Sequence, residues 1–146
     1  DKHLKIKKSF DPNLGAVHID PEQIHRVFIN LFENATDAIE EGGAISISTR
    51  VLQKEKLVRI EFSDDGSGIS PADRDKLFLP HFTTKKRGTG LGLAIVNRII
   101  IDHNGSIQVI DNHPKGTGFV IELPYSPLVL KTDNNSPRSS RQITSS

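Results

Sequence analysis

The chain contains no cysteine, which excludes disulfide bridges and thiolate metal sites. This absence fits a reducing compartment, and we expect a cytoplasmic location. No apolar run approaches the roughly 20 residues that a membrane-spanning helix needs, and no hydrophobic signal segment opens the chain, so we expect no direct membrane contact. Charge of one sign is not in excess either, with 19 Lys and Arg against 18 Asp and Glu. No global field therefore favours nucleic acid, and phosphate chemistry would have to rest on a local site.

The length of 146 residues is that of one domain with a single core. We expect this domain to span residues 1–125. The stretch 126–146 is rich in Ser, Asn, Pro and Thr and has few apolar residues after Leu130, a composition typical of disorder. It is therefore predicted to be a disordered C-terminal tail.

The best-specified element is a helix that begins after Asp20. Asp20 is a favourable N-cap, Pro21 suits the first helical position, and Gln23 is spaced to reach back to the Asp20 backbone in a capping box. Apolar residues then recur at helical spacing and predict one buried stripe, made of Ile24, Val27, Phe28, Leu31, Ala35, Ala38 and Ile39. Gly42-Gly43 is expected to end the helix.

Alternating apolar residues predict an edge strand followed by two antiparallel hairpins. The strands are expected near residues 4–6, 45–51, 58–62, 107–109 and 119–123. A short helix should begin at Ser70-Pro71, and a longer helix over 91–102 is apolar nearly all round, which predicts burial between layers. The fold class is therefore expected to be α+β, a two-layer α/β sandwich whose mixed, mostly antiparallel sheet is covered by helices on one face.

Polar residues form a second stripe on the first helix, beside the apolar one. At about 100° per residue, Asn30, Asn34 and Asp37 share this stripe and would border a cleft. Their side-chain oxygens suit Mg²⁺, which takes one or two protein ligands together with phosphate oxygens. Ordinary polarity of a solvated helix face explains the same spacing, and the stripe alone favours that explanation.

The sequence DDGSG at 64–68 follows a predicted strand. Its glycines at alternate positions let a backbone approach a ligand closely. A partly desolvated Asp64 would accept a hydrogen bond from an exocyclic amine, which separates adenine from guanine. Because Asp-Gly is also among the commonest turn dipeptides, a plain turn remains open for this segment.

The sequence KKRGTGLGL at 85–93 places three alternating glycines directly before a helix. Backbone N–H groups there can face an anion at the positive end of the helix, and Lys85, Lys86 and Arg87 add positive charge. The segment lacks the Gly-Lys-Ser/Thr ending of a P-loop. It favours a phosphate cradle, with a flexible basic loop as the alternative.

The order of these segments resembles that of the ATP-binding domain of sensor histidine kinases, in the superfamily that also includes gyrase- and Hsp90-like ATPases. The resemblance runs from about Asp20 to Leu123. Its five boxes are NLFENATDA (30–38), DDGSGI (64–69), LFLPHFTTK (77–85), GTGLGL (88–93) and GTGF (116–119). The basic residues ahead of the second glycine box are most similar to kinases of the nitrogen-regulation type. A Bergerat-type fold with a mobile ATP lid over residues 78–92 is implied.

The resemblance implies ATP and Mg²⁺ as cofactors. Asn34 would be the principal Mg²⁺ ligand, and Asn30 would lie near the γ-phosphate as a second candidate ligand. The implied catalytic residues are Asn30, Asn34 and Lys85. The implied nucleotide-binding residues are Asn34, Asp37, Asp64, Gly66, Gly68, Ile69, Phe78, Thr83, Thr84, Lys85, Arg87, Gly88, Thr89, Gly90, Leu91, Gly92 and Thr117. Many relatives carry a basic residue where Asp37 stands and Phe where His81 stands, so no direct phosphate contact is assigned to Asp37 and no role to His81.

None of the six histidines lies in the His-Glu/Asp context of a phospho-acceptor box. We therefore expect the attacking histidine on a separate dimerisation domain of the same full-length kinase, with a response regulator as the downstream partner. The chain itself is expected to be a monomeric piece of a larger sensor, whose full-length form is compatible with an anchor in the inner membrane. It should bind ATP without phosphorylating itself.

Three other classes compete with this interpretation. Self-hydrolysing ATPases of the superfamily place a general-base Glu where Asn30 stands, and an amide cannot take a proton from water. Glu33 is offset by about 300° from Asn30 around the helix, so it should not substitute. Anti-sigma serine kinases are the nearer alternative, because they stand alone at about this length, although they too usually carry that Glu. A degenerate nucleotide-binding module is disfavoured, because all five boxes are intact.

Overall fold

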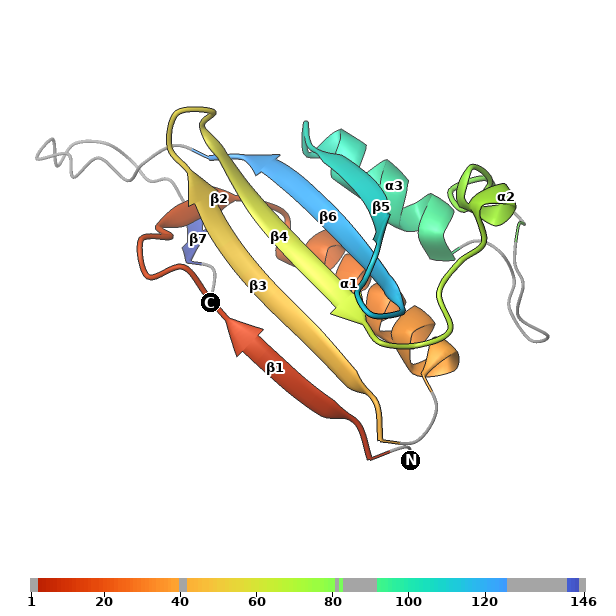
Figure 1. Cartoon of the computed structure of the whole chain (residues 1–146). Coiled ribbons are helices and arrows are strands. Elements are labelled where there is room, and N and C mark those ends of the chain that lie inside the picture. The colour runs from red at the N-terminus through yellow and green to blue at the C-terminus, as the bar shows by residue number, and fades with distance from the viewer. Residues whose placement is uncertain (1–2, 40–41, 81, 83–91, 126–141, 145–146) are drawn as a thin grey trace, which may run out of the picture.

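The computed structural model describes residues 3–39, 42–80, 82, 92–125 and 142–144. Five strands form one sheet in the order β1-β3-β4-β6-β5 (Figure 1). β1 pairs with β3 in parallel, whereas all other neighbours in this sheet are antiparallel. The strands are β1 (Lys5–Ser9), β3 (Ala44–Leu52), β4 (Leu57–Asp64), β5 (Ser106–Asp111) and β6 (Thr117–Pro124). The predicted mixed, mostly antiparallel sheet is confirmed.

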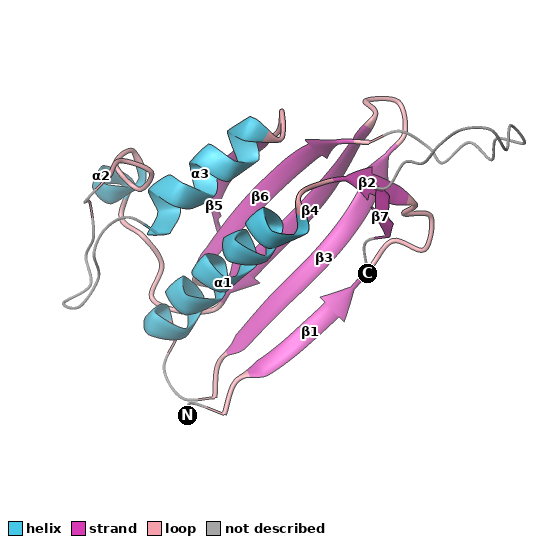
Figure 2. Ribbon diagram, turned by 180° about the vertical axis from the view of Figure 1, so that it is seen from behind, coloured by secondary structure: helices cyan, strands magenta, loops and turns pink. Residues whose placement is uncertain are grey.

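Two helices cover one face of this sheet, α1 (Pro21–Ala38) and α3 (Gly92–Asp102), and no helix of the described residues covers the other face (Figure 2). A third, short helix, α2 (Pro71–Arg74), lies beyond the sheet edge near α3 and is capped by the Ser70 hydroxyl, which accepts from the Asp73 N–H. The expected two-layer α+β sandwich is therefore confirmed. No helix in the described ranges is long and apolar enough to cross a membrane.

The core lies between the two helices and the inner face of the sheet. Leu31 of α1 and Ile45 of β3 are fully buried. Phe62 of β4 packs edge-on against Phe32, with ring centroids 5.5 Å apart, and also contacts Phe28. Each such side chain contributes roughly 1.5–3 kcal/mol through removal from water. This packing fixes α1 along the strand that ends at Asp64.

The start of α1 follows the prediction in part. The Asp20 carboxylate accepts from the N–H groups of Glu22 and Gln23, and Pro21 occupies the first turn. The return half of the expected capping box is wrong, because the Asp20 N–H donates to Nε2 of His103 at 3.0 Å instead of to Gln23. The imidazole of His103 also contacts the Ile99 carbonyl, so this one ring joins the end of α3 to the start of α1.

The end of α1 comes earlier than Gly42-Gly43. Ile39 leaves the helix with extended backbone and turns its buried side chain into the core. The Ala38 carbonyl, which a further helical turn would need, accepts instead from the Ser67 N–H at 3.0 Å. A contact with a distant loop therefore ends the helix.

Two other expectations need correction. α3 is not buried all round, because it lies on one face of the sheet and leaves Ile101 55% exposed. In the expected disordered tail, residues 142–144 form β7 (Gln142–Thr144), which pairs antiparallel with β2 (Ala16–His18). Residues 126–141 and 145–146 lie outside the described ranges, and the domain limit at 125 stays a prediction.

Candidate nucleotide-binding site

The site is built around Asp64, the last residue of β4. Asp64 pairs in register with Thr117, the first residue of β6, and these two are buried polar residues with exposed fractions of 5% and 4%. One carboxylate oxygen of Asp64, Oδ1, accepts from the Gly66 N–H at 2.8 Å and from the Thr117 N–H at 3.4 Å. Both hydrogen bonds that described residues donate to this carboxylate reach Oδ1, so Oδ2 is left as an acceptor for a ligand.

The electrostatics of this carboxylate are set by opposing effects. Burial raises the pKa of Asp64 above its ordinary value, the N–H groups of Gly66 and Thr117 lower it, and the neighbouring Asp65 carboxylate raises it. Burial is the largest of these effects, so the net direction is upward. Ionisation of Asp64 in the folded protein consequently costs free energy, and a hydrogen-bond donor on a ligand would offset this cost.

The glycines after Asp64 let the loop lie directly on the end of α1. A side chain at Gly66 would collide with the Ala38 carbonyl, and the Ser67 N–H donates to this same oxygen. Gly68 has φ 82°, and a Cβ added there would lie 3.6 Å from the Gly116 carbonyl oxygen. The loop at 64–68 is therefore packed on the end of α1 and is not a plain exposed turn, while its close approach to a ligand stays a prediction.

The polar stripe of α1 runs along the neighbouring edge of the site. The Asn30 amide donates to the Arg26 carbonyl of its own helix at 3.1 Å. Its Oδ1 faces Gly92, where an added Cβ would lie 3.1 Å away. Asn34, one turn further along, is half-buried, and Asp37 is exposed. The structure thus places Asn30 beside the last glycine of the second glycine box.

Other predicted contacts fall into two groups. Ile69 and Phe78 are half-buried, and the Phe78 ring packs edge-on against Phe119 of β6 with centroids 6.5 Å apart. This contact anchors the start of the segment predicted to be the lid. Within the predicted lid and phosphate segment, the residues outside the described ranges are His81, Thr83, Thr84, Lys85, Lys86, Arg87, Gly88, Thr89, Gly90 and Leu91.

Sequence reasoning missed two contacts beside Asp64. The Asn112 amide donates to the main-chain carbonyl of Asp64 at 2.8 Å, and the adjacent Asp111 forms an ion pair with Arg74 of α2. Nothing local in the sequence indicates that Asn112 has a partner 48 positions away. Its place in a short turn directly before the last glycine box is the one signal that pointed toward the site.

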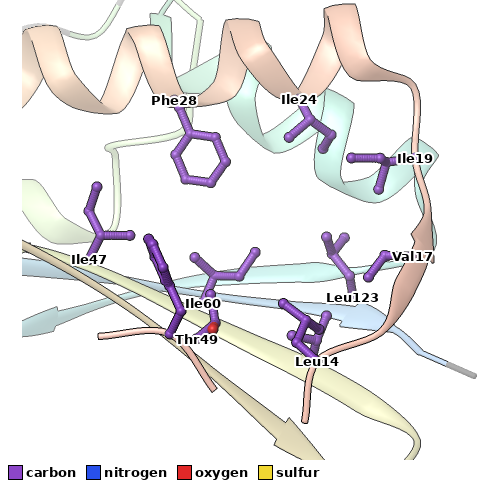
Figure 3. Close-up of a pocket in the computed structure, with 11 residues that line it drawn as sticks. Leu14, Val17, Ile19, Ile24, Phe28, Ile47, Thr49, Ile60 and Leu123 are labelled. Carbon is purple, nitrogen blue, oxygen red and sulfur yellow. The ribbon is translucent and has the colours of Figure 1, made fainter. Parts of the chain in front are cut away.

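A separate apolar cavity of about 230 Å³ lies between the first half of α1 and the sheet (Figure 3). Ile24 and Phe28 line it from the helix and Ile47 and Ile60 from the strands, and Thr49 is its single polar lining residue. The described residues that line it include no charged group for a triphosphate and none of the predicted site residues. The candidate nucleotide site is therefore the polar region around Asp64, not this cavity.

Comparisons with known proteins agree with this geometry. The sequence profile of the family described as histidine kinase-, DNA gyrase B-, and HSP90-like ATPase matches residues 19–127. Sensor histidine kinase ZraS of Escherichia coli K12 is 37% identical over 125 residues, which cover 86% of this chain and 26% of ZraS. Sensory histidine kinase/phosphatase NtrB of Vibrio alginolyticus is 35% identical over 133 residues, which cover 84% of this chain and 38% of NtrB.

Solved structures of a histidine kinase have a domain with the same fold as this chain. The nucleotide-free catalytic domain of histidine kinase ThkA superposes with a TM-score of 0.76 at 35% identity, covering 86% of this chain and 82% of that domain. ThkA has also been solved in complex with the response regulator protein TrrA, where the match has a TM-score of 0.70 at 33% identity and covers 85% of this chain and 35% of ThkA.

The chain belongs to the histidine kinase-, DNA gyrase B-, and HSP90-like ATPase family. Its relatives within that family place it as the ATP-binding catalytic domain of a histidine kinase. It spans about a quarter of the length of the ZraS proteins that it matches.

Proposed function

We propose that this chain binds Mg-ATP and transfers the γ-phosphoryl group to a histidine on a separate acceptor domain. The observation that carries the proposal is the buried Asp64, whose Oδ1 is held by two backbone N–H groups while Oδ2 remains available. A fixed carboxylate acceptor suits the amine of adenine and not the oxo group of guanine. Gly66 lets the loop after Asp64 lie against the end of α1, and we place the flat base beside this loop.

The polar stripe of α1 is proposed to hold the metal and the phosphates. Amide oxygens are ligands that Mg²⁺ accepts, and in the described ranges no cluster of three or more His, Asp or Glu offers another centre. We assign Asn34 as the principal ligand and Asn30, which faces Gly92, as the residue nearest the γ-phosphate. Mg²⁺, when bound, would neutralise charge on the phosphates.

The chain's own residues would then act by position. Asp64 orients the base, the α1 amides orient the other end of the nucleotide, and the predicted phosphate residues Lys85, Arg87 and 88–92 complete the cradle. Because Asn30 is an amide, it cannot take a proton from water, so transfer to an incoming imidazole is favoured over hydrolysis. The imidazole nitrogen forms the new N–P bond while the bond between the γ-phosphorus and the β,γ-bridging oxygen breaks, and ADP leaves.

Partners of the full-length protein follow from the same proposal. The acceptor histidine would lie on a dimerisation domain of the same kinase, and a response regulator would act downstream, as the ThkA–TrrA complex suggests. Membership in the nitrogen-regulation type is a finer proposal that the similarity to NtrB supports. A cytoplasmic location is likewise proposed.

Binding is tested by calorimetry with ATP in the presence and absence of Mg²⁺. Loss of a hydrogen bond to a charged group costs about 1.5–3 kcal/mol, so Asp64→Asn should weaken ATP binding about 10- to 150-fold. Asp65→Asn is the matched control, because it removes the same charge one residue away, where the carboxylate accepts from the Ala44 N–H. If Asp65→Asn weakens binding and Asp64→Asn does not, the assignment of the base acceptor is wrong.

Transfer is tested by mixing the chain with a histidine-bearing dimerisation domain and ATP labelled at the γ-phosphate. We expect label in an acid-labile, base-stable form on the added domain, and negligible release of phosphate without it. Acid-stable label on serine would favour the anti-sigma class, and steady hydrolysis by the chain alone would favour the ATPase class.

A further inference from the structure

The turn that joins β5 to β6 touches the main chain of Asp64 directly. Asn112, at the start of this turn, donates from Nδ2 to the Asp64 carbonyl oxygen at 2.8 Å. Gly116, at its end, has φ 109°, and a side chain there would collide with the same carbonyl. Figure 1 shows this turn beside the end of β4. The turn therefore contacts the main chain of Asp64, whose side chain is the proposed base acceptor.

The orientation of the Asn112 amide is fixed by the turn itself. Its Oδ1 accepts from the His113 N–H at 3.0 Å, and its own N–H donates to the Gly116 carbonyl at 3.0 Å. Because the amide oxygen is used inside the turn, the amide nitrogen must face Asp64. A side chain without a donor at position 112 would leave that contact unmade.

This contact restrains Asp64 at the residue where the chain leaves the sheet. Ile45 and Thr117 flank it in register on the neighbouring strands, but the next residues turn away into the glycine loop. The direction of the Asp64 side chain depends on the orientation of its own peptide groups. A hydrogen bond to its carbonyl therefore restrains the direction in which Oδ2 points.

We propose that Asn112 is a positioning residue for base selection, acting through Asp64 to favour 6-amino purines over 6-oxo purines. The inference rests on the proposed function, because it takes Asp64 to be the acceptor for the amine of adenine. Asn112 touches neither the base nor the phosphates in this account. Its effect is confined to how well Asp64 is aimed.

The readout that separates this role from simple support of the fold is the ratio of the dissociation constants for ITP and ATP. Hypoxanthine carries an oxygen where adenine carries the amine, so it cannot donate from that position to an ionised Asp64. A change in the direction of the Asp64 side chain weakens ATP binding and leaves ITP binding nearly unchanged. General destabilisation of the fold weakens the binding of both nucleotides together. Loss of one well-aligned hydrogen bond should lower the ratio about three- to tenfold.

The experiment measures ATP and ITP binding with Mg²⁺, together with thermal melting, for the wild-type chain and four variants. Asn112→Leu keeps the size of the side chain and removes the donor, and Asn112→Ala serves if the leucine variant does not fold. Gln108→Leu is the matched control, because it removes an amide from an exposed position on β5. Asp64→Asn defines the ratio when the acceptor is lost.

We expect both Asn112 variants to lower the ratio toward that of Asp64→Asn, and Gln108→Leu to leave it unchanged. An unchanged ratio in the Asn112 variants, or an equal loss of both nucleotides, would overturn the inference while leaving the proposed function intact. If the wild-type chain does not prefer ATP, or if Asp64→Asn keeps the preference, the assignment of Asp64 fails and the inference fails with it.

Discussion

Gly66 is a position where the fold should tolerate a methyl group poorly, for reasons of space alone. Its backbone does not have positive φ, so Gly66→Ala tests space alone and not backbone strain. The added Cβ would collide with the carbonyl of Ala38, whose carbon would lie 2.6 Å away, and with the Ala38 side chain at 2.9 Å. The obstacle is mostly main chain, which cannot rotate aside as the end of a long side chain can.

The expected cost has two parts. Forcing an extra carbon into a packed contact costs about 1–3 kcal/mol. Pushing the loop off the helix also weakens the bond from the Ser67 N–H to the Ala38 carbonyl, which costs a further 0.5–1.5 kcal/mol or so. At about 4 °C per kcal/mol for a domain of this size, the melting temperature should fall by about 6–18 °C.

The assay is thermal and urea unfolding followed by circular dichroism, without nucleotide. Ser67→Ala is the control, since Ser67 is exposed and its backbone N–H is kept, and its melting temperature should stay within about 2 °C of wild type. A Gly66→Ala protein that also melts within 2 °C or so of wild type would refute the close docking of the glycine loop on α1.

Three further outcomes follow from individual residues. Because burial raises the pKa of Asp64, its ionised form costs folding free energy at neutral pH, so Asp64→Asn should unfold at an equal or higher urea concentration there, with the difference vanishing toward a pH of about 4. A loss of stability at neutral pH would contradict this. The N–H groups of Val51 and Asn13 lower the pKa of Asp11 below its ordinary 3.8, so Asp11→Asn should be less stable than wild type at neutral pH. This difference in the free energy of unfolding should close as pH falls through the lowered pKa. Urea titrations at several pH values measure it, and a difference independent of pH would exclude the carboxylate as its cause. Gly92→Ala would crowd the flexible side chain of Asn30, so melting should shift by less than about 4 °C while transfer to the acceptor domain slows, and unimpaired transfer would argue against the role of Asn30.

The start of α1 could be predicted from the sequence and its end could not. Asp20 and Pro21 act within one turn of chain, so their pattern is sufficient to place the first residue. The last residue depends on the bond from Ser67 to Ala38, which forms only when the sheet has assembled. The same limit applies to the second half of the capping box, where His103 from another helix takes the Asp20 N–H.

The site shows the same division between local and distant information. The resemblance implied a nucleotide-binding role for both Asp64 and Thr117, and the strand register brings these two residues together. The contact of Asn112 with the Asp64 carbonyl could not be expected, because it depends on where a neighbouring hairpin ends. The exposure of Ile101 was missed for a related reason, since an apolar helix does not reveal in its sequence which side meets the sheet.

The bond between the Ser67 N–H and the Ala38 carbonyl has a consequence for the size of the bound molecule. The loop after the proposed base acceptor Asp64 meets, at this contact, the helix that carries Asn30 and Asn34. The fold therefore sets the separation between these groups before any nucleotide binds. A nucleotide that contacts both Asp64 and Asn30 would therefore have to match a separation that the fold sets in advance.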